Sequence, residues 1–397
     1  MHRRMVREER SESMLIANDS NGRSFNLADN WSRKELANLR KHSTSFQCPQ
    51  CKKQVILKAG QLKIPHFAHK TGHSCQAFSE GESGRHLKGK ADLYHWLNQF
   101  RKTSLEPFLP DISQRPDLLS GDLTAVEYQC SAITAELFSA RTAGYLNRKY
   151  TPFWIYGGKS IEQQYGYYKF SAFQRLFFQF SPQFGFWMTA YCPDQEAFTF
   201  YHQLTPLTAS LYSACKQVIP IEYLTFPPML QRAAVLPFTM DEWIKRKHYW
   251  IQSQLYHRCG IQHPLIQTVY RAKLNLALLP EWMGVPVRLM ALLKNHPLEW
   301  QFYLWNDLFG HTINVTAEEA SEVLERRIQS GHLQKNIFPQ IKTPLAEMAE
   351  EYLQVLNHAG IQLGTDWGME SRVEKQREKE SQFAKQYGES IINRLIF

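Results

Sequence analysis

Apolar residues recur at regular spacings through the first 160 positions of this chain, and the spacing changes from segment to segment. Leu87, Tyr94 and Leu97 fall on one face of a helix. The alternating run 126–129 is typical of a strand, because successive side chains of a strand point to opposite faces. The predicted elements, in order, are a helix over residues 84–100, a strand over 104–109, a hairpin of two strands around 117–129, a helix over 132–149 and a buried strand over 153–156. The pattern therefore predicts an α/β unit with the order α-β-β-β-α-β.

The second half of the chain has a different pattern. Phe, Tyr and Trp are dense between residues 170 and 200, where two strands flank the turn signal Pro193-Asp194. These rings either offer stacking surfaces to single-stranded bases or fill a buried sheet core, and the core is favoured because large aromatics dominate cores. Helical spacing runs from Met240 to about Phe309. The charged segment from Ser371 to Lys385 predicts an exposed helix, either frayed or a tail that docks on a partner.

Two carboxylates belong to the predicted hairpin. Asp117 follows Arg115-Pro116 at the end of one apolar run, and Glu127 lies in the second, alternating run after the turn signal 120–122. Pairing of the strands brings both acids to one edge of the sheet, where they repel each other unless a cation lies between them. Gln129 points the same way as Glu127, since the two are two residues apart. Oxygen ligands of this kind suit Mg²⁺, so the hairpin predicts a metal-dependent nuclease site.

A second group of candidate metal ligands lies upstream. Cys48-Pro49-Gln50-Cys51 offers two thiolates to one ion, and tetrahedral zinc then requires two further Cys or His ligands. We expect these to be His69 and Cys75, with His66 as the rival to His69. A redox role for the cysteine pair is disfavoured, because such pairs open the helix of a βαβ unit and none is predicted here.

Composition narrows the class of partner. The formal net charge of +9 and the pI near 9.1 favour an anionic partner. Trp243 and the basic run 245–248 are a candidate phosphate contact and equally a solvated helix face. No run has the length of a membrane span, and the basic N-terminus is not followed by the apolar region of a signal peptide. Four isolated cysteines indicate reduced, buried thiols: Cys130, Cys192, Cys215 and Cys259.

The acidic hairpin resembles the Asp-x(n)-Glu-x-Lys signature of the PD-(D/E)XK nuclease superfamily through Asp117, Glu127 and position 129. The resemblance implies a restriction-endonuclease-like core that uses Mg²⁺ or Mn²⁺, with Glu82 as a third, outer acid. The lysine of the signature is replaced by Gln129, which can position a water but cannot supply positive charge to the reacting phosphate.

Lys90 is the candidate for the missing charge. Glu82, His86 and Lys90 follow one another in steps of four and share a helix face, so the Lys90 ammonium can reach the site. Otherwise a bound metal alone must activate the water. His86 is a candidate general base or DNA contact, although a histidine on a half-buried helix face is more often a packed residue.

Over about residues 40–160 the chain resembles the CoiA-type competence proteins. The motifs that carry this resemblance are Cys48-Pro-x-Cys51, His66-Phe-Ala-His69, Glu82-Ser-x-x-His86-x-x-x-Lys90, Arg115-Pro-Asp117, Glu127-x-Gln129 and Arg141-Thr-x-x-Tyr145. The resemblance implies a cytoplasmic protein of natural transformation that acts on incoming DNA, single-stranded DNA in particular, beside recombination or competence proteins.

A second helix adds two candidate DNA contacts. Arg141 and Tyr145 are four residues apart and share a face. The pair is similar to the Gln-x-x-x-Tyr pair of RecB-type nucleases, with arginine at the first position. An arginine is well suited to bind a phosphate, and a surface salt bridge is the alternative role.

Together these patterns predict an α/β protein with a restriction-endonuclease-like αβββαβ core. The expected domains are an N-terminal segment 1–40, a zinc-binding module 41–79, a nuclease domain 80–160, an aromatic-rich mixed region 161–230 and a mainly helical C-terminal region 231–397. The expected function is metal-dependent DNA cleavage in transformation. The alternative is a DNA-binding recombination mediator that keeps a nuclease-like fold without cutting.

Overall fold

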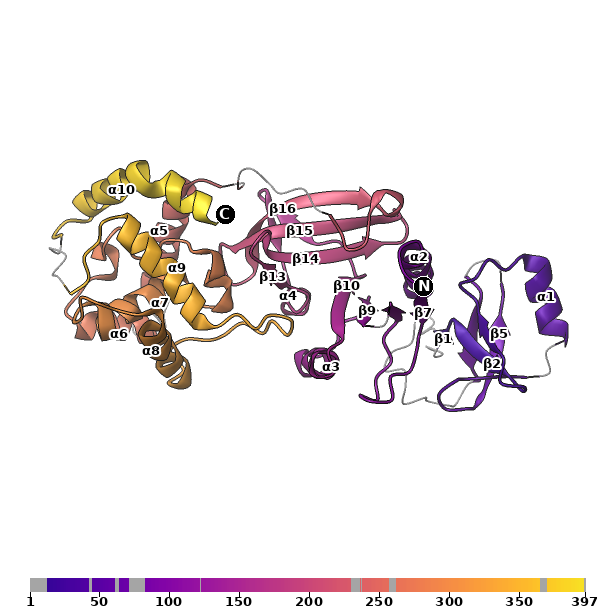
Figure 1. The fold of residues 1–397 in the computed structure, drawn as a ribbon. Helices are drawn as coiled ribbons and strands as arrows, with labels where there is room; N and C mark the ends of the chain where they lie inside the picture. The colour runs from indigo at the N-terminus through magenta and orange to yellow at the C-terminus, as the bar shows by residue number, and fades with distance from the viewer. Residues whose placement is uncertain are drawn as a thin grey trace, which may run out of the picture. The chain divides into compact units, whose positions relative to one another are not determined.

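The computed structural model describes residues 13–42, 45–60, 64–70, 83–121, 123–229, 236, 238–256, 262–364 and 370–395. The chain forms two compact units. Unit 1 comprises residues 1–160, 189–200 and 217–230, and unit 2 comprises 161–188, 201–216 and 231–397. Figure 1 shows the order of the elements along the chain. No described helix has both the length and the apolar character needed to span a membrane.

The N-terminal part of unit 1 is an antiparallel sheet of six short strands in the order β1-β6-β5-β4-β2-β3. Its strand β5 alternates as the sequence does, with Val55 and Leu57 buried and the intervening Ile56 exposed. The elements are β1 (Ser13–Met14), β2 (Ile16–Asp19), β3 (Ser24–Asn26), α1 (Arg33–His42), β4 (Phe46–Gln47), β5 (Gln54–Lys58) and β6 (His66–His69).

The next part of unit 1 has the predicted element order. The elements are α2 (Gly84–Asn98), β7 (Thr103–Leu105), β8 (Leu118–Ser120), β9 (Thr124–Gln129), α3 (Ala135–Asn147) and β10 (Thr151–Tyr156). Strands β7, β8 and β9 pair antiparallel, whereas β10 lies parallel to β9 and to β14 (Gly185–Cys192). The first strand is shorter than predicted, since Glu106 has a positive φ of 48° and Pro107 has no N–H to donate.

Helices α2 and α3 cover opposite faces of this sheet. Tyr128 packs so tightly on α2 that a methyl group at Gly89 would lie 2.1 Å from its ring. Glu127 and Trp154 are paired across β9 and β10 and therefore face the other side. Trp154 stacks there on Phe138 of α3, with ring centroids 3.8 Å apart. The sheet is thus buried on both faces, which explains the apolar run predicted at 153–156.

Unit 2 combines β-strands with a helical region. Its strands are β11 (Glu162–Gln164), β12 (Tyr167–Lys169) and β13 (Gln179–Ser181), and the residues of β14 (Gly185–Cys192), β15 (Ala197–Pro206) and β16 (Leu211–Pro220) are divided between the two units. Its helices are α4 (Ala172–Arg175), α5 (Met240–Tyr256), α6 (Pro264–Arg271), α7 (Pro297–Leu304), α8 (Ala317–Gln329), α9 (Leu345–His358) and α10 (Val373–Arg394). Shorter helical turns are η1 (Ile221–Tyr223, in unit 1), η3 (Leu276–Leu278), η4 (Arg288–Leu292) and η5 (Trp305–Phe309).

The aromatic-rich segment is a buried core, as favoured from the sequence. Phe170, Phe177, Phe178, Phe186 and Phe200 are all buried. These rings therefore fill the interior and do not form a stacking surface for bases.

The charged C-terminal segment differs from its prediction. Helix α10 buries one face that includes Phe383 and Ile391, and α10 packs against α5 (Figure 1). The Lys247 ammonium of α5 is buried and lies 2.5 Å from Glu380 of α10, and His248 also contacts Glu380. The prediction of an exposed terminal helix is therefore wrong for this face, because the sequence shows the charges of α10 but not their partners.

Candidate functional site

The strand register brings Asp117 opposite Glu127. Leu118 of β8 pairs with Val126 of β9, and Asp117 directly precedes β8. The Asp117 carboxylate is held in place by the backbone N–H of Tyr128, which donates to its Oδ2 atom over 2.8 Å. The predicted hairpin therefore places the two acids side by side at one end of the paired strands.

Two side chains of α2 reach Asp117. The Lys90 Nζ atom lies 3.6 Å from Oδ1, and the His86 Nε2 atom lies 3.7 Å from Oδ2. Burial alone would raise the pKa of Asp117, but the charge of Lys90 and the interaction with His86 outweigh burial and hold the pKa below its usual range. Asp117 is therefore ionised at neutral pH. The four-residue step from His86 to Lys90 explains why both side chains reach one carboxylate.

Glu106 is a buried acid that the sequence analysis missed. Its Oε1 atom accepts a hydrogen bond from Lys90 Nζ over 2.5 Å, and the backbone N–H of Leu15 lies 3.4 Å from the same oxygen. The Arg115 guanidinium donates to the Glu106 carbonyl over 2.5 Å. The available signal was an acid between a strand and Pro107, which is too common to single out a site. Lys90 thus lies between two carboxylates, Glu106 and Asp117.

Glu127 faces α3, where Arg141 and Tyr145 both donate to its Oε1 atom. The carboxylate is almost completely buried, with 2% of the residue exposed. Burial raises the pKa of Glu127 to about 7, and the charge of Asp117 adds to this while Arg141 opposes it. Arg141 also donates to the Arg115 carbonyl over 3.1 Å, so this guanidinium has two partners at the site.

The remaining predicted residues of the acidic site have different positions. The Gln129 side chain is buried, and its Nε2 atom donates to the Ser131 carbonyl over 3.0 Å. Glu82 lies outside the described residues. The positive charge near the two acids therefore comes from the helices, through Lys90 of α2 and Arg141 of α3, and not from the strand position that carries lysine in the superfamily signature.

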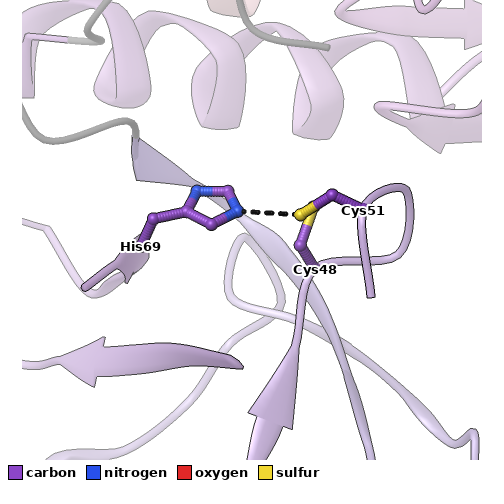
Figure 2. Close-up of side chains that lie close together, drawn as sticks. All are labelled: Cys48, Cys51 and His69. Carbon is purple, nitrogen blue, oxygen red and sulfur yellow. Dashed lines mark hydrogen bonds between the residues drawn. The ribbon is translucent and has the colours of Figure 1, made fainter. Parts of the chain in front are cut away.

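A Cys/His cluster lies in the N-terminal sheet. Figure 2 shows Cys48 and Cys51, from the turn between β4 and β5, facing His69 of β6. Their potential ligand atoms all lie within 4.8 Å of one another, and Cys51 Sγ is 3.3 Å from His69 Nε2. The turn is closed by the N–H of Lys52, which donates to the Cys48 carbonyl over 3.0 Å. Burial raises the pKa of the Cys48 thiol.

The two candidate histidines are distinguished by their direction. His66 and His69 are three residues apart on β6, so they point to opposite faces of the strand. The His66 Nδ1 atom interacts with the Ile64 carbonyl at 2.9 Å, whereas His69 joins the two cysteines. The Cys48, Cys51 and His69 group can hold a metal ion. Cys75, the predicted fourth ligand, lies outside the described residues.

Comparison with known proteins places these features in a family. The chain matches the models for the N-terminal domain of competence protein CoiA over residues 28–78, its nuclease-like domain over 82–234 and its C-terminal domain over 238–386. It is 30% identical over 266 residues to competence protein CoiA of Bacillus subtilis (strain 168), covering 66% of this chain and 71% of that protein. The chain belongs to the CoiA competence protein family. No solved structure matches it.

The CoiA domains separate the two groups of residues. The Cys48, Cys51 and His69 cluster lies within the match to the CoiA N-terminal domain, and the acids Asp117 and Glu127 lie within the match to the nuclease-like domain. The acidic site therefore belongs to the part of a CoiA protein for which a nucleic-acid partner is expected.

The predicted DNA contacts of this CoiA-family protein stay predictions. Tyr145 is buried and bonded to Glu127, and Arg141 keeps 22% of its side chain exposed. The Arg141 guanidinium also lies 5.7 Å from the centre of the Trp154 ring. His86 lies 5.7 Å from the Tyr128 ring and beside Asp117. Of the two predicted DNA contacts on α3, Arg141 is therefore the one whose side chain is partly exposed.

Proposed function

We propose that this protein is a metal-dependent deoxyribonuclease that acts in the cytoplasm on DNA taken up during competence. The observation that carries the proposal is the opposition of Asp117 and Glu127 with the Lys90 ammonium 3.6 Å from Asp117. This arrangement lies in the nuclease-like domain of a CoiA-family protein. Paired acids and one nearby fixed cation are the groups that phosphodiester hydrolysis requires.

The residues fit a divalent ion. Asp117 is ionised, and deprotonation of Glu127 supplies a second carboxylate beside it. Hard oxygen ligands of this kind suit Mg²⁺ or Mn²⁺, and Glu82 is our proposed third, outer ligand. When bound, the ion would supply Lewis-acid chemistry to the scissile phosphate.

Protein side chains have separate roles in this proposal. Lys90 is held by Glu106 and supplies fixed positive charge next to Asp117. Gln129 can position the attacking water, provided its amide turns from the Ser131 carbonyl. Arg141, which is partly exposed, can bind a DNA phosphate by leaving Glu127. That exchange would free the Glu127 carboxylate when DNA arrives.

The contacts of Glu127 also support a second function. Arg141 and Tyr145 already satisfy one of its oxygens, and Gln129 carries no charge. A site closed in this way favours a non-cleaving mediator that keeps the nuclease-like fold and holds single-stranded DNA for the recombination proteins. The two functions differ in their dependence on a divalent metal.

A cleavage assay on end-labelled single- and double-stranded DNA with Mg²⁺ or Mn²⁺ decides between them. We expect Asp117→Asn and Glu127→Gln each to abolish metal-dependent cutting while the matched control Asp111→Asn, at an exposed loop carboxylate, retains it. DNA binding without cutting in the wild type, unchanged in both variants, would support the mediator and reject the nuclease.

We propose that the N-terminal cluster binds structural zinc through Cys48, Cys51, His69 and Cys75. Thiolate and imidazole groups within 4.8 Å of one another are the donor set that tetrahedral zinc prefers. Metal analysis of the purified protein should find about one zinc per chain. The count should fall in Cys51→Ser but not in Cys192→Ser, whose thiol lies outside the cluster. A zinc-free wild type that stays folded would reject this site.

A further inference from the structure

Helix α5 of unit 2 has an inner and an outer face of very different character. Trp243, Lys247 and Ile251 are buried at helical spacing. Tyr249 and Tyr256 lie on the opposite side, two turns apart, and are 75% and 87% exposed. Lys245, Tyr249, Gln252 and Tyr256 lie along this side and are all exposed, and the exposed Glu242 of the first turn precedes them on the same side. We call the four residues from Lys245 to Tyr256 the outer face of α5.

Buried contacts decide which members of the basic run 245–248 remain available. Lys247 donates to the Met283 carbonyl over 3.0 Å and pairs with Glu380. His248 contacts the same carboxylate. Arg246 lies over the Tyr167 ring, 4.4 Å from its centre. Lys245 is exposed and lies on the same side of the helix as Tyr249 and Tyr256. Within the basic run 245–248, which the sequence predicted as a candidate phosphate contact, Lys245 is therefore the exposed cation.

Charge is unevenly distributed in the sequence of this region. Residues 240–275 contain six Lys or Arg and two Asp or Glu, whereas residues 276–370 contain six Lys or Arg and twelve Asp or Glu. A third highly exposed ring, Tyr270 at 82%, belongs to the same basic segment. Positive charge and exposed tyrosines therefore occur together, which favours an anionic partner that also presents flat rings.

We propose that the outer face of α5 binds single-stranded DNA, with Tyr249 and Tyr256 stacking on unpaired bases and Lys245 contacting the backbone. The rings are about 10 Å apart along the helix, from the rise of 1.5 Å per residue. Duplex DNA keeps its base faces stacked inside, so a row of tyrosines discriminates in favour of single strands. This contact is independent of the acidic site and of whether that site cuts DNA.

The test is binding of a fluorescent oligothymidylate to the full chain, followed by anisotropy in EDTA so that no metal-dependent cutting occurs. We expect Tyr249→Ala with Tyr256→Ala to weaken binding on the order of tenfold or more, since stacking on each ring contributes measurably. The double Tyr→Phe variant should bind as the wild type does, because it keeps both rings. Tyr223→Ala, at a 74% exposed tyrosine of unit 1, is the matched control and should leave affinity unchanged.

Two further measurements separate the contact of Lys245 with the DNA backbone from stacking of the tyrosines on bases. Lys245→Gln should lower the slope of affinity against salt by about one unit, as expected for one lost phosphate contact. An abasic oligomer should bind the wild type and the double alanine variant equally. The proposal is overturned if the alanine variant binds oligothymidylate as tightly as the wild type, if its loss persists on the abasic strand, or if single-stranded RNA alone is bound. It is also overturned if the substitution changes the oligomeric state, since the face would then bind a second copy of the chain.

Discussion

At the scale of single residues, the acidic site is organised by side chains that approach from two helices. Lys90 forms ion pairs with Asp117 and Glu106, and Arg141 forms an ion pair with Glu127. Each buried carboxylate would carry a large desolvation cost without its cation. Lys90 is almost completely buried, with 1% of its side chain exposed, so its charge depends on these two partners.

Removal of the Lys90 charge should destabilise the protein strongly. Lys90→Met leaves Glu106 and Asp117 without their shared cation, and we expect the free energy of unfolding to fall by about 3–5 kcal/mol. Adding Glu106→Gln should recover part of the loss, because one of the two unpaired carboxylates is then neutral. Denaturant unfolding measures both effects.

Lys88→Met is the control for that experiment. Lys88 lies on the same helix, but 36% of its side chain is exposed, and exposed ion pairs contribute at most about 1 kcal/mol. If Lys90→Met costs no more than Lys88→Met, the shared-cation account is wrong.

At the scale of elements, the position of α2 depends on a glycine. Gly89 lies against the Tyr128 ring, where a Cβ atom would come within 2.1 Å of a ring carbon. This close approach lets α2 lie flat on the sheet and brings Lys90, the next residue, to Asp117. Helix α3 has a glycine too, but Gly144 faces only the flexible end of the Gln114 side chain.

The two helix glycines should therefore respond differently to alanine. Gly89→Ala forces α2 away from a rigid ring and should lower the free energy of unfolding by about 1–3 kcal/mol, while also weakening the Lys90 to Asp117 contact. Gly144→Ala should be nearly neutral or stabilising by up to about 1 kcal/mol, since alanine is the better helix former. Equal stability of the two variants in thermal unfolding would refute this assignment.

At the scale of the whole molecule, the two units have different interiors. Unit 1 buries its charges around the acidic site, and unit 2 buries Lys247 and Glu380 between α5 and α10. Burial alone would raise the pKa of Glu380, but Lys247 and His248 outweigh burial and lower it to about 2. The C-terminal helix is thus attached to unit 2 by a buried ion pair as well as by apolar contacts.

This ion pair predicts how stability depends on pH. A carboxylate whose pKa is lower in the folded protein contributes stability above its ordinary pKa of 4.5, and the contribution is lost as the pH falls toward about 2. Glu380→Gln should cost about 3–5 kcal/mol at neutral pH, because Lys247 loses its partner. In calorimetric unfolding, the difference in stability between the wild type and the variant should begin to shrink below pH 4.5 and disappear near pH 2. Glu374→Gln, at an exposed residue of α10, is the control, and its stability should depend on pH as that of the wild type does.

The sequence by itself determined the order of elements from α2 to β10, the opposition of Asp117 and Glu127 and the Cys48-x-x-Cys51 turn. These features depend on spacing within short segments, where periodicity and turn residues act locally. The burial of the aromatic segment was predicted from composition instead, because large aromatic side chains dominate protein cores. The sequence left His66 as the rival of His69 and did not say which of the two joins the cysteines.

Only the tertiary structure decided which partners meet. It brought Glu106 to Lys90 across 16 residues, turned His69 toward the cysteines and directed Lys247 inward to Glu380, 133 residues away. Such pairings depend on how α2, β6 and α10 pack, and packing is set by the shapes of many residues distant in sequence. The sequence shows where charges stand along the chain, but whether a charge is buried, paired or exposed is decided by the elements that pack around it.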